Sequence, residues 1–254
     1  MKTVHFVMQG KGGAGKTFTS SILAQYLAQK FSVPVHCFDT DPVNKSFSQM
    51  AALNVDLINI LTDKGEIDPR QFDPLIEKII TQEGTGVIDN GATTFIPLLA
   101  YLKENGVVEF LRESGITVYI HVPLLGGQAF SDTLLGLATV LKSLNTPTVV
   151  WLNNYQGPVV KNTQAFHEMG VYKSNKGLIR GLVDIADRTK DTFGVDIRSM
   201  TSENLTFAEV AQSDKFFIMS KQRIVMFKRS IFEQLDAINL GEKNDVPAEK
   251  DKQA

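Results

Sequence analysis

The feature that most constrains this chain is a glycine-rich segment near its start, Gly10-Lys11-Gly12-Gly13-Ala14-Gly15-Lys16-Thr17. It fits the phosphate-binding loop pattern of a glycine, four residues, and then glycine, lysine and threonine. An apolar run at residues 4–8 precedes it and a helical pattern follows, which is the strand, loop and helix context that the motif needs. A plain glycine turn requires neither the lysine nor the threonine, so the segment predicts nucleotide binding.

Each residue type in this loop has a chemical reason to be there. The glycines let the backbone turn tightly and point its NH groups, with the N-terminus of the next helix, at phosphate oxygens. Lys16 is expected to reach the β and γ phosphates, and the Thr17 hydroxyl to help hold Mg2+. The predicted nucleotide-binding residues of the loop are Gly10, Lys11, Gly12, Gly13, Ala14, Gly15, Lys16, Thr17 and Phe18.

Two further apolar runs end in aspartate. Residues 33–38 lead into Asp39-Thr40-Asp41-Pro42, and residues 86–88 lead into Asp89, which is the Walker B pattern. A strand, helix and strand in succession predict a right-handed crossover and parallel strands, whose carboxyl ends share one edge of the sheet. The acidic residues should therefore meet the glycine-rich loop there, although an acidic turn before proline is also common without any function.

The remaining patterns predict an α/β fold with a predominantly parallel central sheet of about seven or eight strands, flanked by helices on both faces. Apolar spacing favours helices near residues 16–31, 68–80, 97–102, 107–112, 130–144 and 208–240. Phe217, Ile224, Phe227, Ile231 and Leu235 form the expected buried stripe of the last helix. Residues 1–240 are predicted to be a single domain, and residues 241–254 a disordered polar tail.

Composition narrows the setting. The formal net charge of -2 gives no global attraction to nucleic acid or anionic lipid. Neither a signal peptide nor an apolar run of bilayer length is present, and the single cysteine, Cys37, cannot form an internal disulfide, so we expect a cytoplasmic protein. The four histidines share no metal-ligand spacing. Three of them lie in apolar runs predicted to be strands, at residues 4–8, 33–38 and 118–122, and these three, His5, His36 and His121, are expected to be buried and neutral.

With Lys11 at its head, the loop resembles the deviant Walker A box of the ParA/MinD family of P-loop ATPases. The resemblance implies that two subunits sandwich two ATP molecules and that Lys11 crosses the interface to the partner's phosphates; a solvated surface lysine is the alternative. It also implies that Asp39-Thr40-Asp41 is switch I, with Asp41 positioning the attacking water. Asp39 and Asp89, with Thr17, would then hold the hydrated Mg2+. The implied catalytic residues are Lys11, Lys16 and Asp41, and the implied metal-site residues are Thr17, Asp39 and Asp89.

The resemblance extends to the base of the nucleotide. The strand at residues 147–152 ends at Asn153, which matches the family's adenine-reading asparagine because an amide offers both a donor and an acceptor. A strand-ending turn is the ordinary use of asparagine, and Asn154 is the neighbouring alternative. Two departures stand out. Switch II, Asn90-Gly91-Ala92-Thr93, lacks the usual proline, and Phe18 replaces a threonine that faces the α phosphate.

The opening residues and switch II look most like the branch of this family found on broad-host-range conjugative plasmids. That likeness implies a homodimeric, ATP-dependent switch that acts with an unidentified conjugation or partition protein. The alternatives are a partition ATPase that binds DNA nonspecifically and a nucleotide-binding adaptor with negligible hydrolysis. The last helix carries the cations Lys221, Arg223, Lys228 and Arg229, which could contact DNA phosphates or simply lie on a solvent-exposed helix face. The C-terminal tail has no apolar face, so membrane insertion by that route is not expected.

Overall fold

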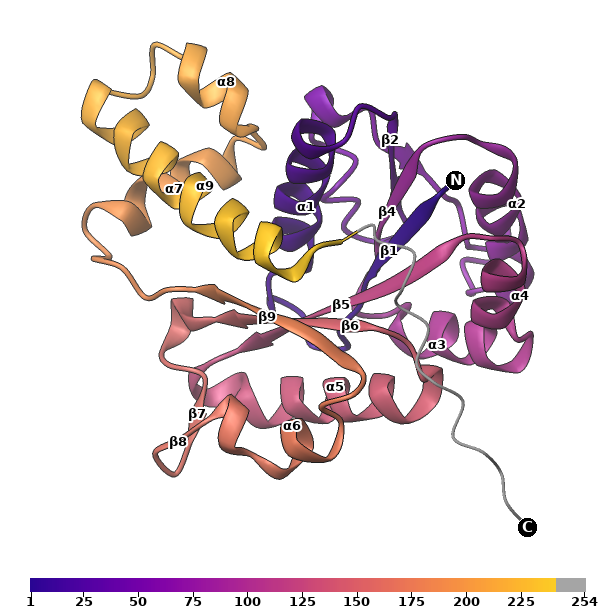
Figure 1. Cartoon of the computed structure of the whole chain (residues 1–254). Coiled ribbons are helices and arrows are strands. Elements are labelled where there is room, and N and C mark those ends of the chain that lie inside the picture. The colour runs from indigo at the N-terminus through magenta and orange to yellow at the C-terminus, as the bar shows by residue number, and fades with distance from the viewer. Residues whose placement is uncertain (241–254) are drawn as a thin grey trace.

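Seven parallel strands form one central sheet within residues 1–240, which are the residues that the computed structural model describes (Figure 1). The strand order is β3-β2-β4-β1-β5-β6-β9, which confirms the predicted fold class. The polar tail predicted for residues 241–254 lies outside the described residues. The strands of the sheet are β1 (Thr3–Val7), β2 (Val35–Asp39), β3 (Asp56–Leu57), β4 (Thr85–Asp89), β5 (Thr117–Leu125), β6 (Thr148–Asn153) and β9 (Ile179–Ile185). A separate antiparallel pair joins β7 (Val160–Lys161) to β8 (Gln164–Ala165).

Helices cover both faces of the sheet, as Figure 1 shows for α9 on one side and α5 on the other. One hydrophobic cluster joins the sheet to α1, α7, α8 and α9, and a second joins it to α2, α3, α4 and α5. The helices are α1 (Lys16–Lys30), α2 (Asp73–Thr81), α3 (Phe95–Glu104), α4 (Val107–Glu113), α5 (Phe130–Leu144), α6 (Gly170–Ser174), α7 (Phe193–Ser202), α8 (Phe207–Gln212) and α9 (Ile218–Ile238).

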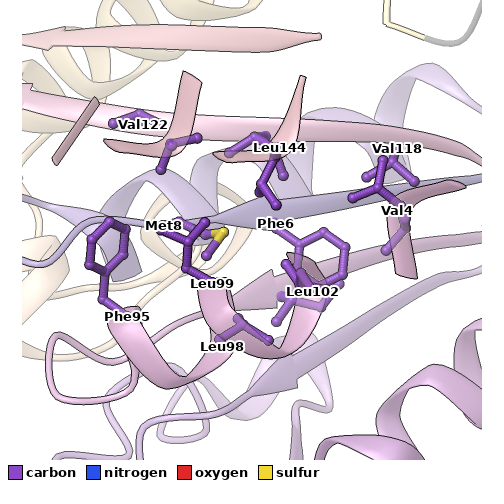
Figure 2. Packing of buried hydrophobic residues seen from close by; sticks show 14 of the residues in the cluster. Val4, Phe6, Met8, Phe95, Leu98, Leu99, Leu102, Val118, Val122 and Leu144 are labelled. Atoms are coloured by element: carbon purple, nitrogen blue, oxygen red, sulfur yellow. The ribbon is translucent and has the colours of Figure 1, made fainter. Parts of the chain in front are cut away.

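Strand β1 shows why the sheet is buried on both faces. Every residue of β1 is buried, and alternate side chains enter opposite clusters. Val4, Phe6 and Met8 pack with the α3 side chains Phe95, Leu98, Leu99 and Leu102 (Figure 2), whereas Val7 faces α1. Continuous apolar runs of this kind are typical of central parallel strands covered by helices on both sides.

The C-terminal segment departs from the single helix that its apolar spacing predicts. The chain is extended at Ser213 and again at Phe217, so α8 ends before α9 begins. Ile224, Phe227, Ile231 and Leu235 are buried as predicted, but the prediction for Phe217 is wrong because its side chain is 83% exposed. The apolar spacing at residues 68–80 also predicts that Ile80 is buried, and this prediction is wrong because its side chain in α2 is 38% exposed.

The topology places several loops at one edge of the sheet. In register, Val7 of β1 lies beside Asp89 of β4, and Asp89 lies beside Asp39 of β2. The carboxyl ends of these strands therefore meet, as the crossover argument predicts. No helix among the described residues is long and apolar enough to cross a membrane.

Candidate nucleotide-binding site

The glycine-rich loop connects β1 to α1 and leaves the start of that helix open. Gly13 and Gly15 have φ angles of 73° and 95°, in the left-handed region that glycine adopts without strain. A Cβ atom on Gly15 would lie 2.8 Å from Asn153 Nδ2, so a side chain there is also excluded by contact. Helix α1 has no side-chain cap and no acidic residue in its first turn. Its N-terminus can therefore receive an anion such as a phosphate group.

A cleft of about 630 Å³ lies over this loop. It brings together eight of the predicted site residues: Gly12, Gly13, Gly15, Lys16, Thr17, Phe18, Asp41 and Asp89. Its other walls include Asn90, the segment after switch I at residues 44–50, and the end of α7 with the loop that follows it, at residues 200–205. The other five predicted site residues do not line it: Gly10, Lys11, Ala14, Asp39 and Asn153. Asp39 nevertheless lies beside Asp89 in the register of β2 and β4.

Asp89 is the central acidic group of the cleft. Its two carboxylate oxygens accept hydrogen bonds from Thr17 Oγ1 at 2.7 Å and Ser20 Oγ at 2.8 Å. Burial raises the pKa of Asp89 to about 7, and nearby Asp39 adds to the increase, while the two hydroxyl groups and Lys16 oppose it. Such a cluster of hydroxyl and carboxylate oxygens, short of positive charge, suits a hard divalent cation. The residues present therefore fit Mg2+.

Lys16 lies largely buried at the start of α1. Its Nζ donates to the Lys11 carbonyl oxygen at 3.3 Å, and its charge acts on Asp89 and Asp41. Burial lowers the pKa of Lys16, and the two aspartates partly oppose this effect. The ammonium group thus lies in the loop with few competing partners, as a phosphate ligand requires.

The two switch I aspartates differ in their surroundings. Asp39 is fully buried, and its carboxylate accepts from the backbone NH groups of Asp41 and Ser48, both at 2.9 Å. Burial is the main reason why its pKa is raised. Asp41 accepts instead from Val43 and Asn44. Although burial disfavours its ionised form, these hydrogen bonds and Lys16 hold the pKa of Asp41 below its usual value.

Switch II packs directly against switch I. A Cβ atom on Gly91 would lie 2.7 Å from Asp41 Cγ, so only glycine fits there without a shift. The Thr40 hydroxyl contacts the Asp89 carbonyl oxygen at 3.1 Å and Asn90 Oδ1 at 3.2 Å. The two segments are therefore joined by direct contacts, although residues 90–93 include no proline.

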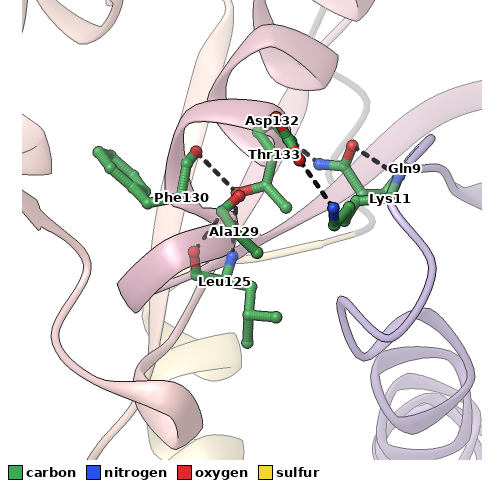
Figure 3. Close-up of polar contacts among 7 residues, drawn as sticks. All are labelled: Gln9, Lys11, Leu125, Ala129, Phe130, Asp132 and Thr133. Atoms are coloured by element: carbon green, nitrogen blue, oxygen red, sulfur yellow. Dashed lines mark hydrogen bonds and ion pairs between the residues drawn. The ribbon is translucent and has the colours of Figure 1, made fainter.

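Lys11 points away from the cleft, toward the start of α5 (Figure 3). Its Nζ lies 2.7 Å from Asp132 Oδ2, and the two side chains are 42% and 61% exposed. Gln9, which is fully buried, holds the backbone behind Lys11: its Nε2 donates to the carbonyl oxygens of Pro123 and Thr133, and its Oε1 accepts from the Lys11 NH. The loop head is thus fixed, while the lysine side chain remains accessible.

A second cleft of about 350 Å³ continues from the loop toward the end of β9. Asn153 lines it, donates from Nδ2 to the Ala14 carbonyl oxygen at 3.2 Å, and accepts from Tyr155 N at 3.1 Å. Phe18 lines both clefts and stacks on Phe227 of α9, with ring centroids 5.9 Å apart. The phenylalanine therefore anchors α1 to α9.

Sequence reasoning missed two parts of this site. Ser20 is one helical turn beyond Thr17, and its spacing alone predicts that both hydroxyls reach the same partner. The end of α7 gave no signal, because its place over the loop depends on the path of the chain after β9. Among the described residues, no group of three or more His, Cys, Asp or Glu side chains is placed to hold a metal ion by itself.

Comparison with known proteins agrees with this geometry. Residues 5–181 match the CobQ/CobB/MinD/ParA nucleotide binding domain family. The chain therefore belongs to this family, as its glycine-rich loop predicts.

Two proteins named TraL from Escherichia coli are also similar to the chain. One is 41% identical over 239 residues and the other 39% identical over 238 residues; each alignment covers 93% of this chain and 98% of the relative. A putative plasmid partition protein from Borrelia burgdorferi, solved bound to AMPPNP, has a TM-score of 0.50 and 15% identity over 93% of this chain and 99% of its own. That structural likeness shows the fold alone.

Proposed function

We propose that the protein is an ATPase that binds Mg-ATP in the cleft over residues 10–17 and hydrolyses it slowly. The observation that carries this proposal is the joining of an open helix N-terminus, Lys16 and the Thr17–Asp89 pair in one cleft. Family membership supports the nucleotide, and the AMPPNP bound to the Borrelia partition protein supports an adenine nucleotide.

The residues of the cleft divide the work of hydrolysis. Lys16 and the loop amides bind phosphate oxygens, and Thr17 with Asp89 would hold Mg2+, with Asp39 behind them supporting its water shell. The metal ion would neutralise charge on the phosphates. Asp41, whose lowered pKa keeps it ionised, accepts a hydrogen bond from the attacking water. Asn153 reads the base from the second cleft.

We further infer that ATP joins two copies of the chain face to face and that Lys11 completes the partner's site. Its exposed ammonium group, on a loop head fixed by Gln9, supports this role. Such a cation acts like an arginine finger where charge develops on the transferred phosphoryl group, worth roughly 10³ to 10⁵ in rate. Likeness to the two TraL proteins over nearly the whole chain supports a switch function in plasmid conjugal transfer.

Phosphate release from ATP tests the enzymatic part of the proposal. Asp41→Ala should retain binding of a fluorescent ATP analogue and lose most phosphate release, whereas Lys16→Ala should lose binding itself. Asp236→Ala, which removes a half-exposed partner of Lys30 remote from the cleft, is the matched control and should behave as the parent protein. If the parent protein bound ATP but released no phosphate above background, and Asp41→Ala changed neither result, the protein would instead be a nucleotide-binding adaptor.

A further inference from the structure

The side-chain amide of Asn90 has a hydrogen-bonded oxygen and a nitrogen without a hydrogen-bond partner among the described residues. The residue is fully buried directly after β4. Its Oδ1 accepts from Thr94 Oγ1 at 2.6 Å and from Thr40 Oγ1 at 3.2 Å. Its Nδ2 is buried and has no hydrogen-bond partner among the described residues. Buried amide donors are nearly always paired in folded proteins, so this group calls for an explanation.

The position of Asn90 indicates where a partner would come from. The residue lines the cleft over the glycine-rich loop, and its backbone NH donates to Val7 of β1, the strand that leads into that loop. An NH2 group offers only hydrogen-bond donors, which suits an anionic oxygen. The cleft is the site where the phosphates are proposed to bind.

The neighbours of Asn90 favour the terminal phosphate over the inner ones. Asp89, on one side, belongs with Thr17 to the proposed metal site, and Gly91, on the other, contacts Asp41, the proposed water-positioning residue. Both the metal and the attacking water act at the terminal phosphoryl group in phosphoryl transfer.

We propose that Asn90 Nδ2 donates a hydrogen bond to the terminal phosphate of a bound nucleoside triphosphate, and so distinguishes it from the diphosphate. The proposal rests on the proposed function. Through Oδ1 the same side chain joins Thr40 of switch I to Thr94, the N-cap residue of α3. A bound triphosphate would therefore contact the residue that already joins both switches.

Two substitutions test the role of the unpaired Nδ2 group of Asn90 separately from that of its Oδ1. Asn90→Asp keeps an oxygen that can accept from Thr40 and Thr94 and replaces only Nδ2, by an oxygen that repels phosphate. Asn90→Ala removes the whole amide without adding charge. Gln49→Glu is the charge control: Gln49 lines the same cleft, and its Oε1 accepts from Asn204 Nδ2 at 3.2 Å, a bond that glutamate can keep.

The measurement is the dissociation constant of Mg-AMPPNP and of Mg-ADP by calorimetry. We expect both Asn90 variants to weaken AMPPNP binding about tenfold or more and ADP binding by less than about threefold, because a hydrogen bond to a charged group is lost only with the triphosphate. Gln49→Glu should change both nucleotides by similar factors. The proposal would be overturned if both Asn90 variants kept the wild-type ratio of the AMPPNP and ADP dissociation constants. It would also be overturned if Gln49→Glu changed this ratio as much as the Asn90 variants do.

Nuclear magnetic resonance gives a readout on the unsubstituted protein. The side-chain NH2 signals of Asn90, assigned by their absence from Asn90→Asp, should shift on adding Mg-AMPPNP and stay nearly unchanged with Mg-ADP. Equal shifts with both nucleotides would contradict a contact to the terminal phosphate. A wild-type protein that binds neither nucleotide would remove the proposed function itself, a result distinct from a lost preference between the two.

Discussion

Lys11 has its ammonium group on the protein surface, 2.7 Å from Asp132 of the same chain. If the lysine acts on the partner's nucleotide, Lys11→Ala should leave monomer nucleotide binding largely intact and abolish dimerisation with Mg-AMPPNP. Mass measured by light scattering during gel filtration checks this. Lys30→Ala removes a similarly exposed lysine from the far end of α1 and is the control. Normal dimerisation of Lys11→Ala would show that the lysine is not the trans-acting group.

The contact with Asp132 leads to a separate prediction. Lys11 must leave this carboxylate before it can reach across an interface, so Asp132→Asn should favour dimerisation. Two such pairs break per dimer and an exposed ion pair contributes only about 0.2–1 kcal/mol, so the midpoint protein concentration for dimerisation with Mg-AMPPNP should fall by less than about thirtyfold. Asp236→Asn, which breaks the comparable pair with Lys30, should have no effect. Weaker dimerisation of Asp132→Asn would mean that Asp132 supports the dimer.

At the residue scale, the sequence identified groups whose chemistry is local and missed groups defined by tertiary contact. The spacing of Lys16 and Thr17 within one motif is enough to place them together. The Lys11–Asp132 pair joins residues 121 positions apart, and no short pattern indicates it. The unpaired amide NH2 group of Asn90 likewise cannot be recognised from the sequence, because it depends on tertiary contacts around the side chain. The chemical roles of the predicted site residues stay predictions.

At the scale of elements, three strands share a buried polar chain inside the sheet. Trp151 of β6 can only donate from Nε1, and it lies 3.1 Å from His121 Nδ1 on β5. His121 Nε2 therefore carries the proton and donates to His5 Nδ1 of β1 at 3.0 Å. Both imidazoles are buried as predicted from their strands, whereas His36 is only partly buried and contacts the Glu83 carbonyl oxygen.

This chain of histidines makes stability sensitive to acid. Burial lowers the pKa of His5 to about 3 and that of His121 well below its usual value. Below pH 6.5, His5 takes up a proton in the unfolded chain but not in the folded protein. The free energy of unfolding therefore decreases as the pH is lowered. Between pH 7.5 and 5.0, His5→Gln should lose about 2 kcal/mol less than the parent in urea unfolding. Equal losses would contradict a neutral, buried His5.

Helix α9 offers a paired test of the apolar stripe. Phe227 is 5% exposed and stacks on Phe18, whereas Phe217 is 83% exposed. Phe227→Ala should reduce the free energy of unfolding by about 3–5 kcal/mol, because it leaves a cavity between α9 and α1. Phe217→Ala should change it by less than about 0.5 kcal/mol. Urea titration followed by circular dichroism distinguishes the two, and similar losses would place Phe217 in the core.

Elements with strong periodicity were predictable, and breaks between them were less so. The α1 and α5 patterns each match one continuous helix. The break before α9 falls in a segment without proline or glycine, where Phe217 continues the apolar spacing although its backbone is extended. The two-residue strands β3, β7 and β8 are too short to show a period.

At the scale of the whole molecule, the alternating strand and helix patterns were enough to predict the parallel sheet. The eight residues of the glycine-rich loop were enough to indicate the family. The cationic face of α9 gives the DNA-binding alternative little support. Arg223 is within salt-bridge distance of Asp196, and Lys228 lies over the rings of Phe207 and Phe232. A partition ATPase would still show ATP-dependent DNA binding that weakens steeply with salt.

The solution mass of the protein with Mg-ADP and with Mg-AMPPNP distinguishes a nucleotide-dependent dimer from a permanent monomer. We expect a monomer with ADP and a dimer with AMPPNP, in the absence of DNA. Repeating the measurement with DNA at low salt identifies the partition alternative, which predicts a dimer bound to DNA. A chain that stays monomeric with both nucleotides while binding each of them would contradict the dimer switch and leave a nucleotide-binding adaptor.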